Sequence, residues 1–489
     1  MKKSIQYLFL LLSISAFSQQ EKTVSVEKNY NNWGWNDVFV AKNKYISLAV
    51  VPEAAGRILE YNLGEVPSLW INPKLMGKSF GTSDEVKMNE WRNFGGYRLV
   101  PLPIENSSIN KFGKKSKRWP PPVVIGDAPY KVSIGENSEG KKTIEVQSGV
   151  QELPVPFFYG KEKKFLYPDE IDEKIQYSRS LYIEPKSSLV FINHTLKNVG
   201  NKTIKKGLMI SSQHVSWSDS KLQDGHNFSA FIPFSEDLKL PSGEQMEISA
   251  TPKQRWRYIN RNRFKLDKNN PEHIKKYFNR GTNWKGEVAP GIYEVEYDYN
   301  AMAGLHIISS KSWIAYVNKI TNTAFVKIME PYDEAKEYDH GINMAIFCSG
   351  LETGYIETEV KTPLYKLQPK ESFNYKEIHG AAKIESSPIL DVNQTGIITK
   401  NLSIDKERKI VKGSYGVFIE GKAVLFLTDA KGKVVKEIPL EEVNPLKELK
   451  VNTKIKLVKK VKQIALIVKD SKSVNHVLDF LIQKRQGRG

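Results

Sequence analysis

The sequence predicts a mostly β protein, with a large β-sandwich followed by a small C-terminal β-sandwich. Hydrophobic and polar residues alternate at period two over most of the 489 residues, which is the pattern of half-buried strands. Long stretches with helical periodicity are nearly absent. The predicted strands are short, and turns rich in Gly, Pro and Asn separate them at regular intervals, as in sandwiches.

The large domain is predicted to span residues 28–383. Its clearest feature is a predicted long hairpin, in which residues 189–196 and 204–213 are joined by a turn around Gly200 and Asn201. Further strands are predicted at residues 44–51, 143–147, 175–183, 305–308, 312–319 and 323–329. Residues 252–285 lack alternation and are rich in Arg, Asn, Lys and Trp, so we interpret them as a long insertion or lid.

The amino-acid composition of the predicted strands changes between Ala382 and Pro388. Beyond this point the predicted strands are rich in Val, Ile and Lys and contain few aromatic residues. They lie at residues 414–419, 422–428 and 463–469, with a turn at 429–433. Residues 388–489 therefore predict a small immunoglobulin-like β-sandwich, and a structural or spacer module is its simplest role.

The N-terminus predicts export. Lys2 and Lys3 precede a short apolar core at residues 7–14, and Ala16-Phe17-Ser18 places small residues where a signal peptidase cleaves. A transmembrane anchor is the alternative, but the apolar run is far shorter than the roughly 20 residues that span a bilayer. We therefore expect residues 1–18 to be a signal peptide, a periplasmic or secreted protein, and no membrane anchor.

The single cysteine and the net charge indicate what kind of reactive group and what kind of binding partner to expect. Cys348 is the only cysteine, and because it ends an apolar run we interpret it as a buried strand residue rather than a nucleophile. The formal net charge is +18, spread over several basic clusters, and basic surfaces attract polyanions. For an exported protein we expect no nucleic acid, so an acidic or sulfated polysaccharide is the natural candidate. A solvated surface without a dedicated partner is the alternative.

Three clusters of polar and aromatic residues supply the ingredients of a sugar-binding cleft. They are residues 51–58, then 91–98 with 118–122 and 126–130, and finally 211–217 with 355–364. Aromatic faces stack on the apolar face of a pyranose, while Arg, Asn, Asp and Gln side chains bind hydroxyls and carboxylates. Gly95-Gly96 would let the backbone approach a ligand closely, although the pair could equally form only a bulge.

The order of these motifs resembles a known family. Gly95-Gly96-Tyr97-Arg98-Leu99, Trp119 with three prolines, and Asp127-Ala128-Pro129-Tyr130 look like the uncharacterised family DUF4380, a branch of the galactose-mutarotase-like supersandwiches. The resemblance covers roughly residues 28 to 383, and the segment from Tyr355 to Ser372 is similar to the closing strand pair of that fold. It implies a large two-sheet sandwich whose cleft lies on a concave face.

The resemblance also implies roles for individual residues. Aldose mutarotases open a sugar ring with a histidine and a glutamate, and His214 and Glu357 stand where these catalytic residues would be expected. Phe94 stands where those enzymes have a second histidine before the glycine pair, so mutarotase activity does not carry over intact. For His214, a satisfied histidine at a strand end is the alternative.

Several further residues are candidate ligand contacts. Glu357 and Glu359 are two apart on a predicted strand, so they share a face, and on a buried face each would raise the pKa of the other. On a solvated face they would be ordinary surface charges. The predicted substrate-binding residues are Arg57, Arg92, Asn93, Trp119, Asp127, Gln213 and Glu359. The other histidines lack metal-ligand spacing, so we expect no metal and no cofactor.

Three functions remain open from the sequence. The first is an enzyme that moves a proton on a sugar, in the manner of a mutarotase or epimerase, and the second is a non-catalytic carbohydrate-binding protein. The third is a lyase or hydrolase of acidic polysaccharide, since supersandwiches also accompany such enzymes. The paired glutamates favour an enzyme, whereas Phe94 favours binding or altered chemistry. All three place the protein in polysaccharide utilisation with a carbohydrate ligand, for which the charge favours an anionic sugar.

Overall fold

The computed structural model describes residues 23–87, 90, 92–116, 121–216, 227–248, 271, 284–297, 303–309, 311–349, 354–405, 407–456 and 460–482. The predicted signal peptide, residues 1–18, lies outside this range, as does Trp119. The predicted insertion at 252–285 also lies outside it, except for Pro271, Trp284 and Lys285. None of the helices in the described part is long and apolar enough to cross a membrane.

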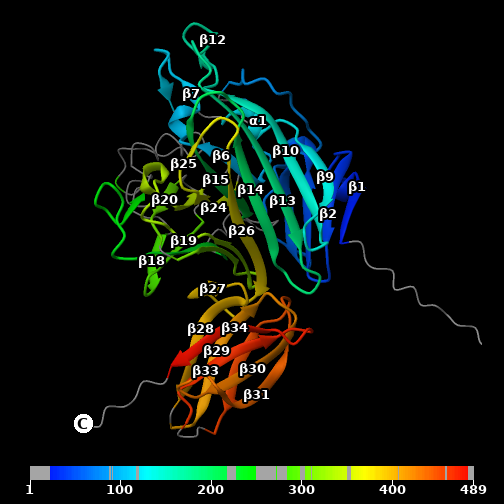
Figure 1. Ribbon diagram of the computed structural model, residues 1–489, viewed down its shortest axis with the longest axis vertical. Helices are drawn as coiled ribbons and strands as arrows, with labels where there is room; N and C mark the ends of the chain where they lie inside the picture. Colours follow the sequence, from blue (N-terminus) through cyan, green and yellow to red (C-terminus); the bar gives the residue numbers. More distant parts are fainter. Residues whose placement is uncertain are drawn as a thin grey trace, which may run out of the picture.

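Two large antiparallel sheets form the body of the protein (Figure 1). The larger sheet has the strand order β1 (Val24–Lys28), β2 (Asp37–Lys42), β3 (Ile46–Val51), β4 (Arg57–Leu63), β6 (Gly96–Leu102), β15 (Ile204–Val215), β24 (Tyr355–Lys361), β23 (Met344–Cys348), β20 (Ala303–Ile307) and β17 (Met246–Ile248). Two short strands join it, β5 (Val66–Pro67) beside β4 and β25 (Tyr365–Leu367) beside β15.

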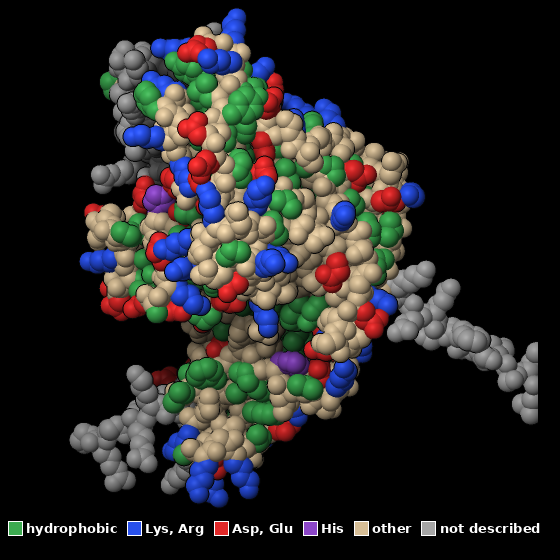
Figure 2. Space-filling view, turned by 45° about the horizontal axis from the view of Figure 1, so that its top comes forward, with side chains coloured by type: hydrophobic (Ala, Val, Ile, Leu, Met, Phe, Trp, Pro, Cys, Tyr) green, Lys and Arg blue, Asp and Glu red, His purple; other side chains and the backbone are tan. Residues whose placement is uncertain are grey.

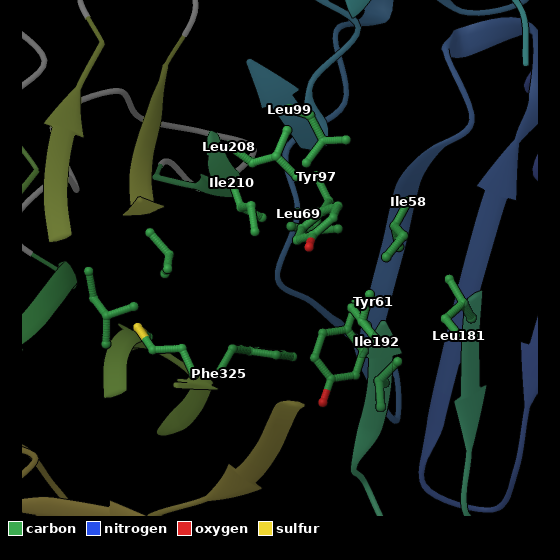
Figure 3. Close-up of a cluster of buried hydrophobic side chains, with 14 of the residues drawn as sticks. Ile58, Tyr61, Leu69, Tyr97, Leu99, Leu181, Ile192, Leu208, Ile210 and Phe325 are labelled. Carbon is green, nitrogen blue, oxygen red and sulfur yellow. The ribbon is translucent and has the colours of Figure 1, made fainter. Parts of the chain in front are cut away.

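The second sheet faces the first across the core. Its order is β18 (Trp284–Ala289), β19 (Ile292–Glu296), β16 (Phe228–Pro233), β21 (Trp313–Asn318), β22 (Thr323–Met329), β26 (Ser372–Lys383), β14 (Val190–Asn198), β13 (Glu173–Ile183), β10 (Lys142–Leu153) and β9 (Lys131–Glu136). Side chains of both sheets meet in one hydrophobic cluster, where for example Tyr97 and Ile210 of the first face Ile192 and Phe325 of the second (Figure 3). Period-two alternation produces this inner face, as predicted.

Short strand pairs and helical turns lie outside the two large sheets. The strand pairs are β7 (Ser108–Ile109) with β8 (Lys115–Ser116), and β11 (Phe157–Tyr159) with β12 (Lys164–Leu166). The helical turns are η1 (Tyr30–Asn32), η2 (Pro52–Ala54), η3 (Pro73–Leu75), η5 (Ile104–Asn106), α1 (Val123–Gly126) and η7 (Asp339–Gly341). The fold class is therefore mostly β, as the sequence predicted, and Cys348 is a buried strand residue.

The predicted hairpin at residues 189–213 is wrong. Both of its strands exist, but β14 pairs with β13 and β26, whereas β15 pairs with β6 and β24 in the other sheet. The connection between them crosses from one layer to the other. The physical reason is that Ile192 and Leu196 of β14 and Leu208 and Ile210 of β15 all bury into the same core, so the two strands face each other instead of pairing at their edges.

Residues after Asp391 form a small body with a core of its own, at the lower end of Figure 1. One four-stranded sheet contains β27 (Asp391–Asn393), β28 (Gly396–Asp405), β29 (Ile410–Val417) and β32 (Leu449–Lys454). The other contains β31 (Val434–Val443), β30 (Gly421–Thr428), β33 (Gln463–Lys469) and β34 (Asn475–Ile482).

This small body packs against the outer face of the second sheet. Phe418, which is fully buried, shares a hydrophobic cluster with Trp313 and Val326 of the large domain. The Trp313 Nε1 atom also donates a hydrogen bond to Asp391 Oδ1 at 2.9 Å, and the Ser188 amide donates one to the Phe418 carbonyl at 2.8 Å. The two parts therefore share an interface with an apolar cluster and hydrogen bonds as well as a peptide connection.

Candidate functional site

The central strands of the larger sheet carry polar side chains on its outer face. The register aligns Gly96 of β6, Gln213 of β15 and Glu357 of β24 in one row. The next row on the same face consists of Arg98, Ser211 and Glu359. The intervening residues turn inward, because side chains alternate along a strand, and among them Tyr97, Ile210 and Ile356 belong to the core.

Arg57 and Asp127 extend this row of polar groups toward β4. Arg57 opens β4, and its Nη2 atom lies 3.3 Å from Asp127 Oδ1 while also donating to the Gly126 carbonyl at 2.8 Å. The Arg57 Nη1 atom donates to the Gly95 carbonyl at 3.0 Å and to Asn93 Oδ1 at 3.3 Å. Both partners of the ion pair are buried. Arg57 thus binds together the end of α1 and the turn that leads into β6.

Gly95 and Gly96 serve chain packing. Both have positive φ, 89° and 68°. A Cβ atom at Gly95 would lie 2.2 Å from the carbonyl oxygen of Trp70, and one at Gly96 would lie 2.4 Å from that of Ile58. Neighbouring backbone therefore explains why both positions are glycine, whereas the expected approach of a ligand stays a prediction.

Burial shifts the ionisation of the two glutamates. It raises the pKa of Glu357, although the charge of Arg98 opposes this. Burial and then the negative charge of Glu357 raise the pKa of Glu359 to about 7. The pair therefore retains a proton near neutral pH. Of the mutual effect that the sequence predicted, the charge of Glu357 acting on Glu359 is the part observed.

Arg98 interacts electrostatically with both the Arg57–Asp127 ion pair and the Glu357–Glu359 pair. Its charge acts on Arg57 and Asp127 as well as on both glutamates. Burial, and next the charge of Arg98, lowers the pKa of Arg57 to about 10. Burial raises the pKa of Asp127 to about 6 against the nearby guanidinium groups. Sequence reasoning did not select Arg98, although the alternation from Gly96 places it on the same face.

Several buried polar atoms of this cluster lack a hydrogen-bond partner in the described part of the chain. They are Arg57 Nε, Arg92 Nη1, Asn93 Nδ2, Asp127 Oδ2 and Gln213 Oε1. Buried polar groups are satisfied in most native proteins, so a concentration of unmet ones indicates a site for a ligand or ordered water. Together with the glutamate pair they define the outer-face cluster: Arg57, Arg92, Asn93, Arg98, Asp127, Gln213, Glu357 and Glu359.

Comparisons with known proteins found similar chains among solved structures. No family model matches the sequence, and no curated protein matches it. Similar solved structures include a galactose mutarotase-like protein from Clostridium acetobutylicum, at 10% identity and a TM-score of 0.39, covering 74% of this chain and 98% of that one. A galactose mutarotase related enzyme from Lactobacillus acidophilus is 12% identical with a TM-score of 0.40, covering 73% and 99%. The likeness concerns the fold alone.

The structural neighbours are thus galactose mutarotase-like proteins, as the motifs of the large domain suggested. The narrower resemblance to DUF4380 stays a prediction, since no family model supports it.

His214 lies on the opposite face of the sheet from Glu357. It follows Gln213, so its side chain turns into the core, where it stacks on Tyr316 of the second sheet with ring centroids 4.3 Å apart. The His214 Nδ1 atom donates to the Ser68 carbonyl at 3.2 Å, which leaves Nε2 to accept a hydrogen bond from Thr358 Oγ1 at 2.9 Å. The expectation that His214 and Glu357 face one cleft is wrong.

The interior position also sets the charge of His214. Burial, and next the positive charge of Lys327, lowers its pKa well below the usual value. With both ring nitrogens bonded to protein groups and a neutral ring, His214 matches the alternative of a satisfied core histidine. It lines a small interior cavity with Tyr61, Ser68, Leu69, Ser212, Phe325, Val326, Lys327, Thr358 and His379.

Of the predicted site residues that the structure describes, seven converge with Arg98 on the outer face through hydrogen bonds, register or charge: Arg57, Arg92, Asn93, Asp127, Gln213, Glu357 and Glu359. Arg92 joins through its charge acting on Asp127, and its guanidinium carbon lies 4.4 Å from the centre of the Phe80 ring. His214 does not converge with them.

One group of potential metal ligands was not foreseen. Glu105, Asp339 and His340 place one ligand atom each within 4.8 Å of one another. The Lys361 ammonium lies 4.0 Å from Asp339, so a cation already stands at this position. Glu105 and His340 are partly exposed, and the His340 Nε2 atom lies 3.0 Å from Glu105 Oε1, as in an ordinary surface hydrogen bond.

Proposed function

We propose that this protein is exported and carbohydrate-active, binding a sugar at the outer-face cluster and moving a proton on it through Glu357 and Glu359. The observation that carries the proposal is the buried glutamate pair, which shares a face with Arg98 and adjoins polar atoms with unmet hydrogen bonds. A carboxyl group whose pKa lies near neutral pH can both give and accept a proton, as general acid–base catalysis requires.

The proposed reaction resembles that of a mutarotase but uses different residues. Phe94, at the position expected for a second histidine, is fully buried. His214 faces the core. Glu357 and Glu359 would therefore perform the proton transfers alone, with Arg98 stabilising the charge that forms on either carboxylate. The basic chain favours fragments of an acidic polysaccharide as the source of the sugar.

The test measures interconversion of sugar anomers by the chain from residue 19 onward, with exchange NMR on neutral sugars and uronic acids. We expect Glu357→Gln and Glu359→Gln each to lower the rate by roughly 10²–10⁴, the usual effect of losing a positioned acid or base. Glu60→Gln is the matched control. Glu60 is also buried on the larger sheet, but it accepts hydrogen bonds from Tyr30 and Ser47 instead of facing Arg98.

A non-catalytic carbohydrate-binding protein is the second candidate, favoured by the core position of His214. Binding that persists while anomers interconvert at the buffer rate would establish this candidate and overturn the enzymatic one. Shortening of an acidic polysaccharide chain would instead establish a lyase or hydrolase.

Export has a separate test. If residues 1–18 are removed on export, mass spectrometry of protein from a periplasmic extract or the medium should find a mature N-terminus near Gln19. A chain retained in the cytoplasm with Met1 would contradict export without affecting the sugar site.

A further inference from the structure

Two buried hydrogen-bond donors at one end of the outer-face cluster have no acceptor among the described residues. Asn93 is almost fully buried, and its Oδ1 atom accepts from the Gly95 amide at 3.2 Å and from Arg57 at 3.3 Å. These contacts fix the orientation of the amide, which leaves Nδ2 without an acceptor among the described residues. Arg92 Nη1 is likewise buried without an acceptor in this part of the chain, while its guanidinium stacks near Phe80.

The other end of the cluster is rich in acceptors. Gln213 Nε2 points to Glu357 Oε1 at 3.5 Å, so Gln213 Oε1 faces away, and no described group donates to it. Gln213 pairs with Gly96, only three residues beyond Asn93, so the donor end and the acceptor end are neighbours. A ligand that contacts both ends must carry acceptors on one side and hydroxyl groups on the other.

The charges favour an anion at the donor end. Arg57, Arg92 and Arg98 all act on Asp127, and Arg57 forms a close ion pair with it. Near neutral pH the glutamate pair holds a proton, so within the outer-face cluster the three guanidinium groups exceed the ionised carboxylates. The Asp84 carboxylate, which also acts on Asp127, accepts hydrogen bonds from the Val123 amide and from Gln151 Nε2. A carboxylate is planar and accepts from an amide and a guanidinium at once, which suits the two vacant donors.

We propose that the outer-face cluster selects a sugar acid, whose carboxylate binds Arg92 and Asn93 while its ring hydroxyls face Gln213 and Glu357. This inference rests on the proposed function and adds the substrate class, the direction in which the sugar lies, and the two residues that determine specificity.

The test compares galacturonate and glucuronate with galactose and glucose by titration calorimetry. A charge-assisted contact to two donors predicts that each acid binds at least about tenfold more tightly than its neutral counterpart. Asn93→Asp retains the Oδ1 acceptor for Arg57 but replaces the vacant donor with a carboxylate oxygen. It should abolish the preference for acids, so that each acid binds no more tightly than its neutral counterpart.

Two further variants make the result decisive. Asn401→Asp, at an exposed position of β28 in the small domain, adds the same charge far from the cluster and should retain the preference. Arg92→Gln removes the second donor without adding charge and should weaken only the acids. Retained binding of neutral sugars by Asn93→Asp also demonstrates that this variant is folded.

Each alternative result has a distinct meaning. Equal affinity for acids and neutral sugars would overturn the inference and leave the proposed function standing. A preference for acids that survives in both Asn93→Asp and Arg92→Gln would overturn the assignment of these residues. Binding of neither class would overturn the inference and the proposed function together.

Discussion

Glu359 shows how the burial of one carboxyl group makes the stability of the protein depend on pH. Its pKa is raised from 4.5 to about 7, so the folded protein holds a proton that the unfolded chain releases at lower pH. Stability therefore falls as the pH rises from about 4.5 to 7 and stays lower above that range. Evolution tends to tolerate such a loss where the group serves a function.

Glu359→Gln should recover that stability. At pH 8 we expect the free energy of unfolding to increase by roughly 3 kcal/mol, because a neutral amide avoids the unfavourable charge. At pH 4.5 the change should be small. Urea unfolding at the two pH values measures the difference, with Glu236→Gln in an exposed loop as the control. An equal effect at both pH values would contradict a protonated Glu359.

The core histidines predict the opposite dependence on pH. Burial lowers the pKa of His194 and of His214, so the folded protein keeps both neutral while the unfolded chain takes up protons near pH 6.5. Stability should therefore fall as the pH drops below about 6.5. His214→Gln should make this fall less steep in urea titrations between pH 7 and 5, and an unchanged slope would contradict a neutral, buried His214.

The sequence predicted the membership of the cluster better than the direction of its side chains. Glu357 and Glu359 were placed correctly because a spacing of two fixes a shared face in any strand. His214 was misplaced because neither spacing nor composition indicates which of two neighbours, Gln213 or His214, faces the core. Both are buried polar residues, and only the pairing of Gln213 with Glu357 resolves the choice.

At the level of elements, the turn into β6 depends on Gly95. Gly95→Ala would bring a side chain against the Trp70 carbonyl while φ stays positive, so both overlap and backbone strain destabilise the fold. We expect a loss of about 2 kcal/mol or more, together with weaker ligand binding, since Asn93 and Arg57 are anchored to the same turn.

Gly81→Ala is the matched control for this prediction. A Cβ atom at Gly81 meets nothing within 4 Å, and its φ is not positive, so thermal unfolding should change little. Similar stability of the two variants would mean that the turn at Gly95 can relax.

Most strands were predictable as elements, whereas their partners were not. The predicted segment at 323–329 coincides with β22, because alternation and β-branched residues mark a strand locally. The exchange of partners by β14 and β15 depends on which faces bury against each other, and that is a property of the assembled core. A short connection with Gly200 and Asn201 suits a hairpin turn and a crossing between layers equally well.

For the whole molecule, the cluster shared by the two bodies predicts coupled unfolding. Phe418 lies against Gly380, where an added Cβ would come within 2.8 Å of the ring. Phe418→Ala should therefore lower stability by about 3–5 kcal/mol and shift the unfolding of the large domain as well as the small one. Fluorescence of Trp313, which lies in the cluster, follows this in urea.

Phe480→Ala is the control, because Phe480 is 54% exposed on β34 and should contribute less than about 0.5 kcal/mol. A shift confined to the small domain would show that the two bodies unfold independently. The predicted boundary between residues 383 and 388 can then be examined by limited proteolysis, where the buried side chains of Ile384 and Ile389 should slow cleavage.

The pairing of β6, β15 and β24 has a consequence for how the protein matures. Gln213 meets Gly96 from the first quarter of the chain and Glu357 from its last third, so the site arises only from contacts between distant parts of the sequence. Closing such long loops is slow, and no early fragment contains both the arginines and the glutamates. If the outer-face cluster binds a sugar as proposed, a chain that emerges from synthesis in order would therefore be unable to bind it until nearly all of the large domain is present, and sugar binding would then report completed folding.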